Sequence, residues 1–141
     1  MKRNLIGTLS LVVMAVMMNA TAHAQTLATA NVPFAFRVGS AQLPAGSYVI
    51  NADGDMAVTI HDRKSKAGAL TGVRREISTK PGSKLIFHRV AGQYFLAEIR
   101  RGAATPAMLL PTSKQEKSLL QEMKLADGQA PATEEVLIAL N

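Results

Sequence analysis

Two histidines are the side chains that could most directly serve a reaction in this chain. His61 precedes Asp62 and His88 precedes Arg89, and each lies in a segment whose alternating pattern predicts a β-strand. A catalytic zinc ion takes three protein ligands, so His61, His88 and a nearby aspartate form the candidate metal set. The spacing does not require such a site, because the chain has no HExxH motif and no cysteine. We therefore predict no metal and no cofactor, and keep a small metal-dependent hydrolase as an alternative.

Other reactive residue types also lack the spacing that catalysis needs. A serine nucleophile on a strained turn is typical of GxSxG, and a phosphate-binding loop is typical of GxxxxGK; the sequence contains neither. The segment Asp53-Gly54-Asp55 could offer oxygen ligands to calcium, but it lacks the further ligands of a calcium loop. Asp-Gly is also a common turn sequence. The residues therefore favour a non-enzymatic role.

The first 24 residues have the three-part layout of a secretory signal peptide. Lys2 and Arg3 supply the positive start, residues 5–18 are mostly apolar, and the AHA sequence of residues 22–24 matches the small-x-small cleavage pattern. An apolar run of 14 residues is shorter than the ~20 that a membrane-spanning helix needs. An uncleaved anchor is the alternative. We predict export by a cleavable signal to the periplasm or the extracellular space, with no transmembrane span in the mature chain.

Basic residues are unevenly distributed in the mature chain. Loss of Lys2 and Arg3 leaves 14 basic and 10 acidic residues, and residues 25–124 carry a net charge of +7 because the last 17 residues hold three acids and no base. A field of this sign attracts anionic polysaccharides and lipids. We therefore expect an anionic envelope polymer or a lipid surface as partner. The candidate contact residues are Arg63, Lys64, Lys66, Arg74, Arg75, Arg100 and Arg101.

The aromatic residues do not support nucleic-acid binding. Single-stranded nucleic acid is usually held by aromatic side chains interleaved with basic ones. All six aromatic residues of the mature chain instead lie in alternating apolar segments, where they are expected to form the core. Export would also separate the protein from most nucleic acid, so we predict no such partner.

Signal removal leaves 117 residues, a usual size for one domain. Residues 25–31 are small and polar, and we expect them to form a flexible lead. Residues 32–141 are expected to form a single β-rich domain. Because the chain has no cysteine, no disulfide contributes to its stability.

Alternation with a period of two predicts eight short strands. In the first of them, residues 32–38, the apolar side chains Val32, Phe34, Phe36 and Val38 share one face. The remaining strands are expected at residues 47–51, 56–61, 67–75, 84–90, 93–100, 106–110 and 136–140.

The strongest hairpin signal is the sequence KLIFHRVAGQYFLAEIR, residues 84–100. We expect a three-residue turn, Val90-Ala91-Gly92, with Gly92 left-handed and a bulge beside it. The register would then pair Lys84 with Glu98, Ile86 with Leu96, His88 with Tyr94, Leu85 with Ala97, and Phe87 with Phe95. Opposite charges and aromatic rings would meet across the strands in this arrangement.

One helix is predicted near the C-terminus. Ser113 and Glu116 have the spacing of a capping box, and the helix is expected to run to about Lys124, with Leu119, Leu120 and Met123 on its apolar face. Short strands, glycine-rich turns and a single helix predict an all-β fold, a single antiparallel β-sandwich or partly open barrel with one short C-terminal helix. An α+β arrangement in which the helix covers one sheet is the alternative.

Two sequence blocks, VPFAFRVGSAQLPAGSY and KLIFHRVAGQYFLAEI, resemble those of a known group of proteins. They resemble small exported bacterial proteins of unknown function that share a PFxFxVG...LPAGxY start and an FHRxxxxYFLAEI hairpin. The two blocks cover about a quarter of the mature chain. The resemblance implies an exported, β-rich domain and carries over no activity to any residue.

The sequence thus leads to three hypotheses of function. The first is an exported, non-enzymatic β-sandwich protein with a binding or structural role in the envelope or outside the cell. The second is the hydrolase that uses His61 and His88, which requires the two imidazoles to lie close together. The third is a carrier of an apolar small ligand, which requires a cavity of ~300 Å³ or more.

Overall fold

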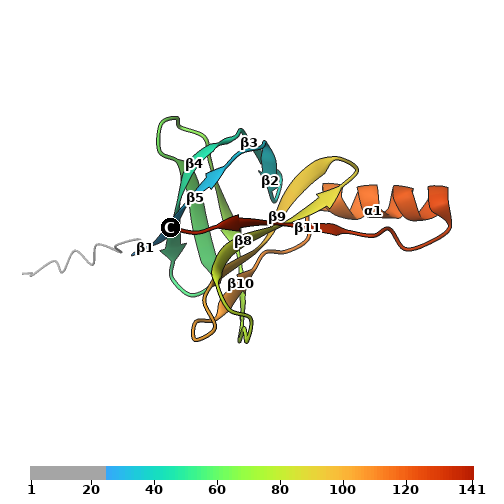
Figure 1. Ribbon diagram of the computed structural model, residues 1–141. Helices are drawn as coiled ribbons and strands as arrows, with labels where there is room; N and C mark the ends of the chain where they lie inside the picture. Colours follow the sequence, from blue (N-terminus) through green and yellow to red (C-terminus); the bar gives the residue numbers. More distant parts are fainter. Residues whose placement is uncertain (1–24) are drawn as a thin grey trace, which may run out of the picture.

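Two β-sheets pack face to face in the computed structural model, which describes residues 25–141 (Figure 1). The signal peptide predicted for residues 1–24 lies outside the described residues. The first sheet, sheet A, is antiparallel throughout. Its order is β1 (Gln25–Val32), β4 (Gly46–Asp53), β5 (Ala57–Asp62) and β6 (Gly68–Gly72).

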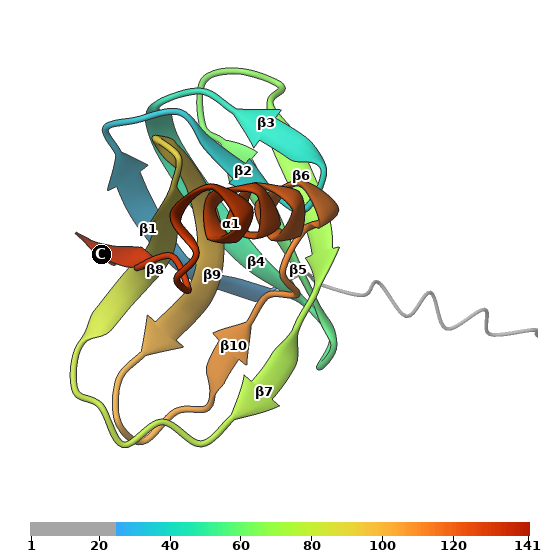
Figure 2. The same cartoon turned by 90° about the vertical axis from the view of Figure 1, so that its right-hand side faces the viewer.

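Sheet B is built mainly from the second half of the chain. Its main order is β11 (Glu134–Ala139), β8 (Ser83–Val90), β9 (Gln93–Arg101), β10 (Ala107–Leu109) and β7 (Arg74–Glu76). Strand β2 (Phe36–Val38) pairs with β3 (Ala41–Leu43) in antiparallel fashion and with the first half of β9 in parallel. The helix α1 (Lys114–Asp127) starts beside sheet B and projects away from the body (Figures 1 and 2).

The two sheets are joined along one side and remain open elsewhere. Ala30 of β1 forms a bridge with Leu140, and the backbones of Thr29 and Asn141 exchange two hydrogen bonds of 3.1 and 2.9 Å. At another edge the chain passes from β6 to β7 through Val73, so it crosses from sheet A to sheet B. The fold is therefore mostly β, not closed, and has one helix in its described part, as the sequence predicts.

Apolar side chains from both sheets fill the space between them. The predicted stripe is confirmed, because Val32, Phe36 and Val38 are buried and Phe34 packs against the same core. The largest fully buried side chains of the described region include Phe36, Tyr48, Ile50, Ile60, Leu85, Phe87, Ile99 and Met108.

The sequence LPAGSY forms a corner that begins β4. Tyr48 is buried against Phe36 in an edge-to-face arrangement, with ring centroids 5.0 Å apart, and its hydroxyl donates to the Pro44 carbonyl at 2.5 Å. A side chain at Gly46 would approach the Asp62 carboxylate to 3.3 Å, so glycine suits this crowded position. Burial, with a smaller contribution from the Asp62 charge, raises the pKa of Tyr48. This part of the motif therefore has a structural role.

Three local predictions are wrong. Residues 25–31 form most of β1, where a flexible lead was expected, because they pair with β4. The predicted strand 32–38 is divided, since β1 ends at Val32 and β2 begins at Phe36; Pro33, which has no N–H to donate, lies in the break. The predicted strand 67–75 divides at Val73 into strands of different sheets.

The predicted register of the β8–β9 hairpin is also wrong. Its turn has two residues, Ala91 and Gly92, both with positive φ (48° and 76°), and this turn type fits the twist of a hairpin. His88 therefore pairs with Phe95 and Phe87 with Leu96, where Tyr94 and Phe95 were expected.

A bulge near Ala97 shifts the register a second time. Beyond it, Ile86 pairs with Glu98, Leu85 with Ile99 and Lys84 with Arg100, so the expected pairs with Leu96, Ala97 and Glu98 do not form. Leu96 and Ile99 are three positions apart and would face opposite sides of a regular strand. The extra residue lets both side chains enter the core.

The helix prediction is confirmed and extended. The Ser113 side chain accepts a hydrogen bond from the Glu116 N–H at 3.1 Å, and α1 ends at Asp127 before a left-handed Gly128. Leu119, Leu120 and Met123 are partly buried, as expected. Among the described helices none is long and apolar enough to cross a membrane.

Candidate functional site

The two histidines do not come together. In β5, Val58 and Ile60 point into the core, so the alternation places His61 on the outer face of sheet A. His88 lies in sheet B and contacts α1, with the core between the two imidazoles. Within residues 25–141 no group of three metal-ligating side chains is found. The geometry does not support a metal site shared by His61 and His88.

His88 instead belongs to a contact that the sequence did not predict. Its Nδ1 lies 2.9 Å from Oε1 of Glu116, which is buried at the start of α1. A capping box would turn the Glu116 side chain back toward the Ser113 N–H. Here that carboxylate reaches sheet B, and Gln115 adds a hydrogen bond to Gln93 at 3.1 Å. These contacts attach the first turn of the helix to the β8–β9 hairpin, which is a structural role.

Arg100 is not available to an external partner in the way its position in the sequence suggests. The Arg100 side chain is only 9% exposed, and its Nε and Nη2 donate to Oε1 of Glu98 at 3.0 and 2.9 Å. Arg101 is half-buried, and its Nε is buried without a partner among the described residues. The ion pair of Arg100 with Glu98 could have been predicted from the sequence, because residues two apart in a strand share a face.

Arg100 and Glu98 border a small hollow of about 190 Å³ that Ser78 and Lys80 also line. The Arg100 guanidinium already has a carboxylate partner there. This hollow therefore offers little uncompensated charge to a ligand.

Arg74 and Arg75 lie in β7, an edge strand of sheet B, and both form contacts within the protein. Arg74 forms an exposed ion pair with Glu76 at 2.6 Å. Arg75 reaches the β4–β5 turn, where it donates to the carbonyls of Asp55 and Gly54 at 3.0 and 3.2 Å. The Asp53-Gly54-Asp55 segment thus forms a turn held by Arg75, in agreement with the turn interpretation.

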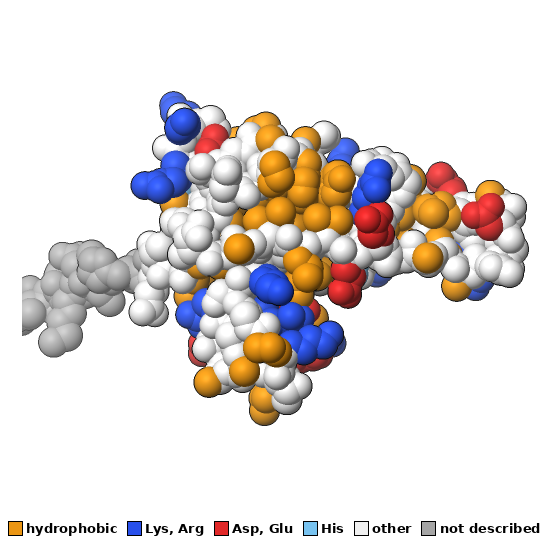
Figure 3. Space-filling view, viewed as in Figure 1, with side chains coloured by type: hydrophobic (Ala, Val, Ile, Leu, Met, Phe, Trp, Pro, Cys, Tyr) orange, Lys and Arg blue, Asp and Glu red, His pale blue; other side chains and the backbone are white. Residues whose placement is uncertain are grey.

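Arg63, Lys64 and Lys66 are exposed, and none of them forms an ion pair within residues 25–141. They lie where the chain turns from β5 to β6, and we call residues 62–66, which start with the last residue of β5, the basic loop. Figure 3 shows Lys and Arg side chains gathered on this loop at the upper left of the molecule, with a second group in the lower half. The basic loop is therefore the exposed positive feature that best fits the sequence prediction.

Asp62 organises the basic loop from within. Its carboxylate accepts hydrogen bonds from the Ser65 hydroxyl at 2.6 Å and the Ser65 N–H at 3.2 Å. The Ser65 hydroxyl bond, with smaller contributions from backbone N–H groups, lowers the pKa of Asp62 against the opposing effect of burial. At the base of the loop the Asp62 N–H donates to the Ala67 carbonyl at 2.8 Å and the Arg63 N–H to the Ser47 carbonyl at 2.9 Å. The three basic side chains are thus presented from a defined turn.

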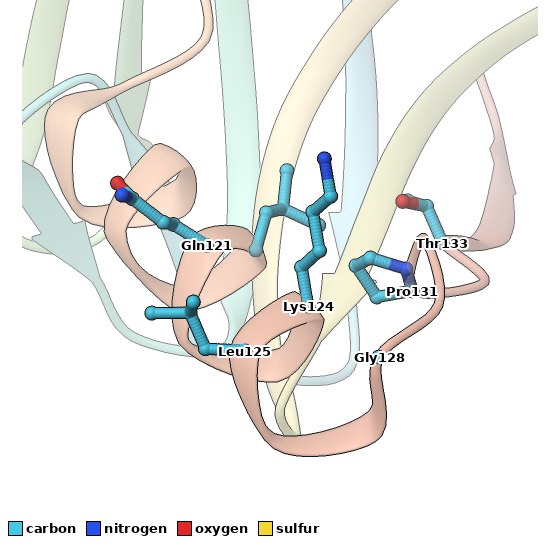
Figure 4. A pocket seen from close by; sticks show the side chains of 7 residues that line it. Gln121, Lys124, Leu125, Gly128, Pro131 and Thr133 are labelled. Carbon is cyan, nitrogen blue, oxygen red and sulfur yellow. The ribbon is translucent and has the colours of Figure 1, made fainter.

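A further hollow lies at the end of the molecule to which α1 projects, between α1 and the chain that returns toward β11 (Figure 4). It has a volume of about 650 Å³, and Lys124 is its one charged lining residue in the described region. Leu120, Leu125 and Pro131 supply its apolar surface. No Asp, Glu or His is among its lining residues in the described part of the chain.

The chain matches no protein-family model, and comparisons with curated proteins and with solved structures give no match. The candidate site therefore rests on its own geometry: a structured, exposed basic loop at one end of a packed sandwich.

Proposed function

We propose that this protein is an exported, non-enzymatic binding protein of the bacterial envelope or the extracellular space, which holds an anionic polymer through the basic loop. The observation that carries the proposal is the exposure of Arg63, Lys64 and Lys66 on one turn fixed by Asp62. Export and the relation to the small exported proteins with the PFxFxVG...LPAGxY start stay predictions from the sequence.

The contrast among the seven candidate basic residues supports this assignment. Arg74, Arg75 and Arg100 have partners within the protein, so binding an external anion would compete with those contacts. The loop residues keep their charge in water, where exposed contacts of about 0.5 kcal/mol each can add along a repeating polymer. A polymer is favoured over a compact ligand because the loop is convex and does not enclose a pocket among the described hollows.

The hydrolase alternative is weakened by the separation of His61 and His88 described above. The carrier alternative placed its ligand in an apolar cavity of ~300 Å³ or more within the β-strands of the interior, which is a different kind of site from a groove at the surface. The described interior is filled by packed side chains, while the larger hollows are open at the surface.

Binding to dextran sulfate, with neutral dextran as control, tests the proposal. The variant Arg63→Gln/Lys64→Gln/Lys66→Gln is expected to bind about tenfold more weakly, since three contacts of about 0.5 kcal/mol are lost. The matched control Lys80→Gln/Lys117→Gln/Lys124→Gln removes the same charge from exposed positions elsewhere and is expected to change the affinity less than about threefold.

Equal weakening by the two triple variants would overturn the assignment to the loop, because only the net charge would then matter. Binding to vesicles of anionic phospholipid without binding to dextran sulfate would identify a lipid surface instead and would also contradict the proposal.

A further inference from the structure

A second surface lies at the edge where β6 crosses into β7, away from the basic loop. The chain leaving β10 passes this crossover on its way to α1 (Figure 2). Two hollows of about 510 and 500 Å³ open along this segment, and Pro111 and Thr112 line both of them, so the hollows adjoin. We call the two together the flank groove. Each volume lies within the ~300–1,000 Å³ typical of small-molecule sites.

One end of the flank groove is apolar. Its apolar lining residues are Met56, Val73, Leu109, Leu110 and Pro111, and Leu110 packs against the hydrophobic core, so the groove floor continues the core. Arg74 also lines this end, but its guanidinium is paired with Glu76 at 2.6 Å. Met56 is 78% exposed at this end. Covering apolar surface is favourable by about 25 cal/mol for each Å², so this end suits an alkyl chain.

The other end adds two basic residues to a mostly apolar lining. Arg37, Ser40, Ser113 and Lys114 line it, and no Asp or Glu lines either hollow within the described part of the chain. The Arg37 guanidinium donates a hydrogen bond to the Gln42 side chain at 3.2 Å. Because Gln42 is neutral, this bond does not compensate the positive charge of Arg37. Lys114 is exposed. This end therefore complements an anion.

We propose that the flank groove binds an anionic amphiphile with a single alkyl chain. The chain lies at the Met56 end, and a carboxylate or phosphate headgroup lies between Arg37 and Lys114. A fatty acid and an alkyl phosphate share this chemistry. The inference is independent of polymer binding, since the basic loop contributes no lining residue.

Calorimetric titration with dodecanoate and dodecyl phosphate, each below its micelle concentration, tests the proposal. Dodecyl maltoside supplies the same chain with a neutral headgroup and is expected to bind at least about tenfold more weakly. Binding of either anion supports the proposal. The anion that binds more tightly shows whether the groove prefers a carboxylate or a phosphate headgroup.

Two pairs of variants locate the site. Met56→Glu is expected to weaken binding of the preferred anion about tenfold, whereas Leu70→Glu, which makes the same change at a residue 70% exposed outside the groove, should alter it less than about twofold. Arg37→Gln/Lys114→Gln should remove most of the preference for the anions over maltoside. Lys80→Gln/Lys124→Gln should keep that preference.

Several results would overturn the proposal. These are equal binding of dodecyl maltoside, equal effects of Met56→Glu and Leu70→Glu, and binding to anionic vesicles without binding to either monomeric anion. The basic-loop triple variant should bind the amphiphile normally, so a failure here is distinguishable from a failure of polymer binding.

Discussion

The basic loop and the end of β9 contain similar charges and use them differently. Arg63, Lys64 and Lys66 stand in solvent on a turn that Asp62 stabilises from within. Arg100, in contrast, is buried beside Glu98, which compensates its charge. A charge that leaves water must find a partner inside the protein, whereas an exposed one stays free for an external partner. The loop can therefore present its positive charges to a polymer, whereas Arg100 cannot.

The largest expected effect tests the buried side of this comparison. Glu98→Leu leaves the Arg100 guanidinium without its carboxylate and should lower the free energy of unfolding by about 3–5 kcal/mol. Glu76→Leu breaks the Arg74 pair, whose side chains are 76% and 52% exposed, and should cost no more than about 1 kcal/mol. Urea denaturation measures both. Similar losses in the two variants would contradict the distinction between structural and free charges.

The corner beneath the basic loop provides the next test. Tyr48 pairs with Asp62 across β4 and β5, and Tyr48→Phe removes the hydrogen bond to Pro44, at a cost of about 1 kcal/mol. Because the folded protein raises the pKa of Tyr48, it keeps a proton that the unfolded chain loses near pH 10. This contribution is present below about pH 10 and is lost as the pH rises toward the folded pKa.

The stability difference between the wild type and Tyr48→Phe should therefore shrink above about pH 10. Denaturation of both proteins at a series of alkaline pH values measures this difference. A difference that is constant or grows across this range would contradict the role assigned to the buried hydroxyl.

The smallest expected effect concerns Asp62 itself. The folded pKa of Asp62 is lowered, mainly by the Ser65 hydroxyl, so its contribution is present above the unfolded pKa of about 3.9 and is lost as the pH falls through the lower folded value. Amide hydrogen exchange at Ser65, corrected for the intrinsic pH dependence, should show protection that declines in acid. In Asp62→Asn this pH dependence should be absent. Acid-independent protection in the wild type would argue that the carboxylate does not order the loop.

The sequence predicts the general class of fold well because local patterns determine it. Alternation identifies Val32, Phe36 and Val38 as core-facing residues, and the spacing of Ser113 and Glu116 places the start of α1 correctly. The β8–β9 register could not be obtained in this way. It depends on a bulge that lets Leu96 and Ile99 both reach the core, and that requirement arises only when sheet B packs on sheet A.

The candidate site could be predicted only in part. The seven basic residues are evident in the sequence, and the partners of Arg74 and Arg100 lie two residues away in the same strand. The contact of Arg75 with the turn at Gly54 joins segments about 20 residues apart, and no local pattern predicts it. His88 illustrates the same limit, because its neighbour Glu116 comes from a helix 28 residues later. The flank groove is likewise formed by segments far apart in the chain, so no local motif predicts it.

The most direct test of the central claim is to map backbone amide chemical shifts during titration with dextran sulfate. The basic-loop account predicts that the largest changes fall at residues 62–66 and their neighbours in β5 and β6, with little change at Lys117 and Lys124 on α1. Changes spread evenly over all exposed basic residues, or centred on the helix or the flank groove, would contradict it.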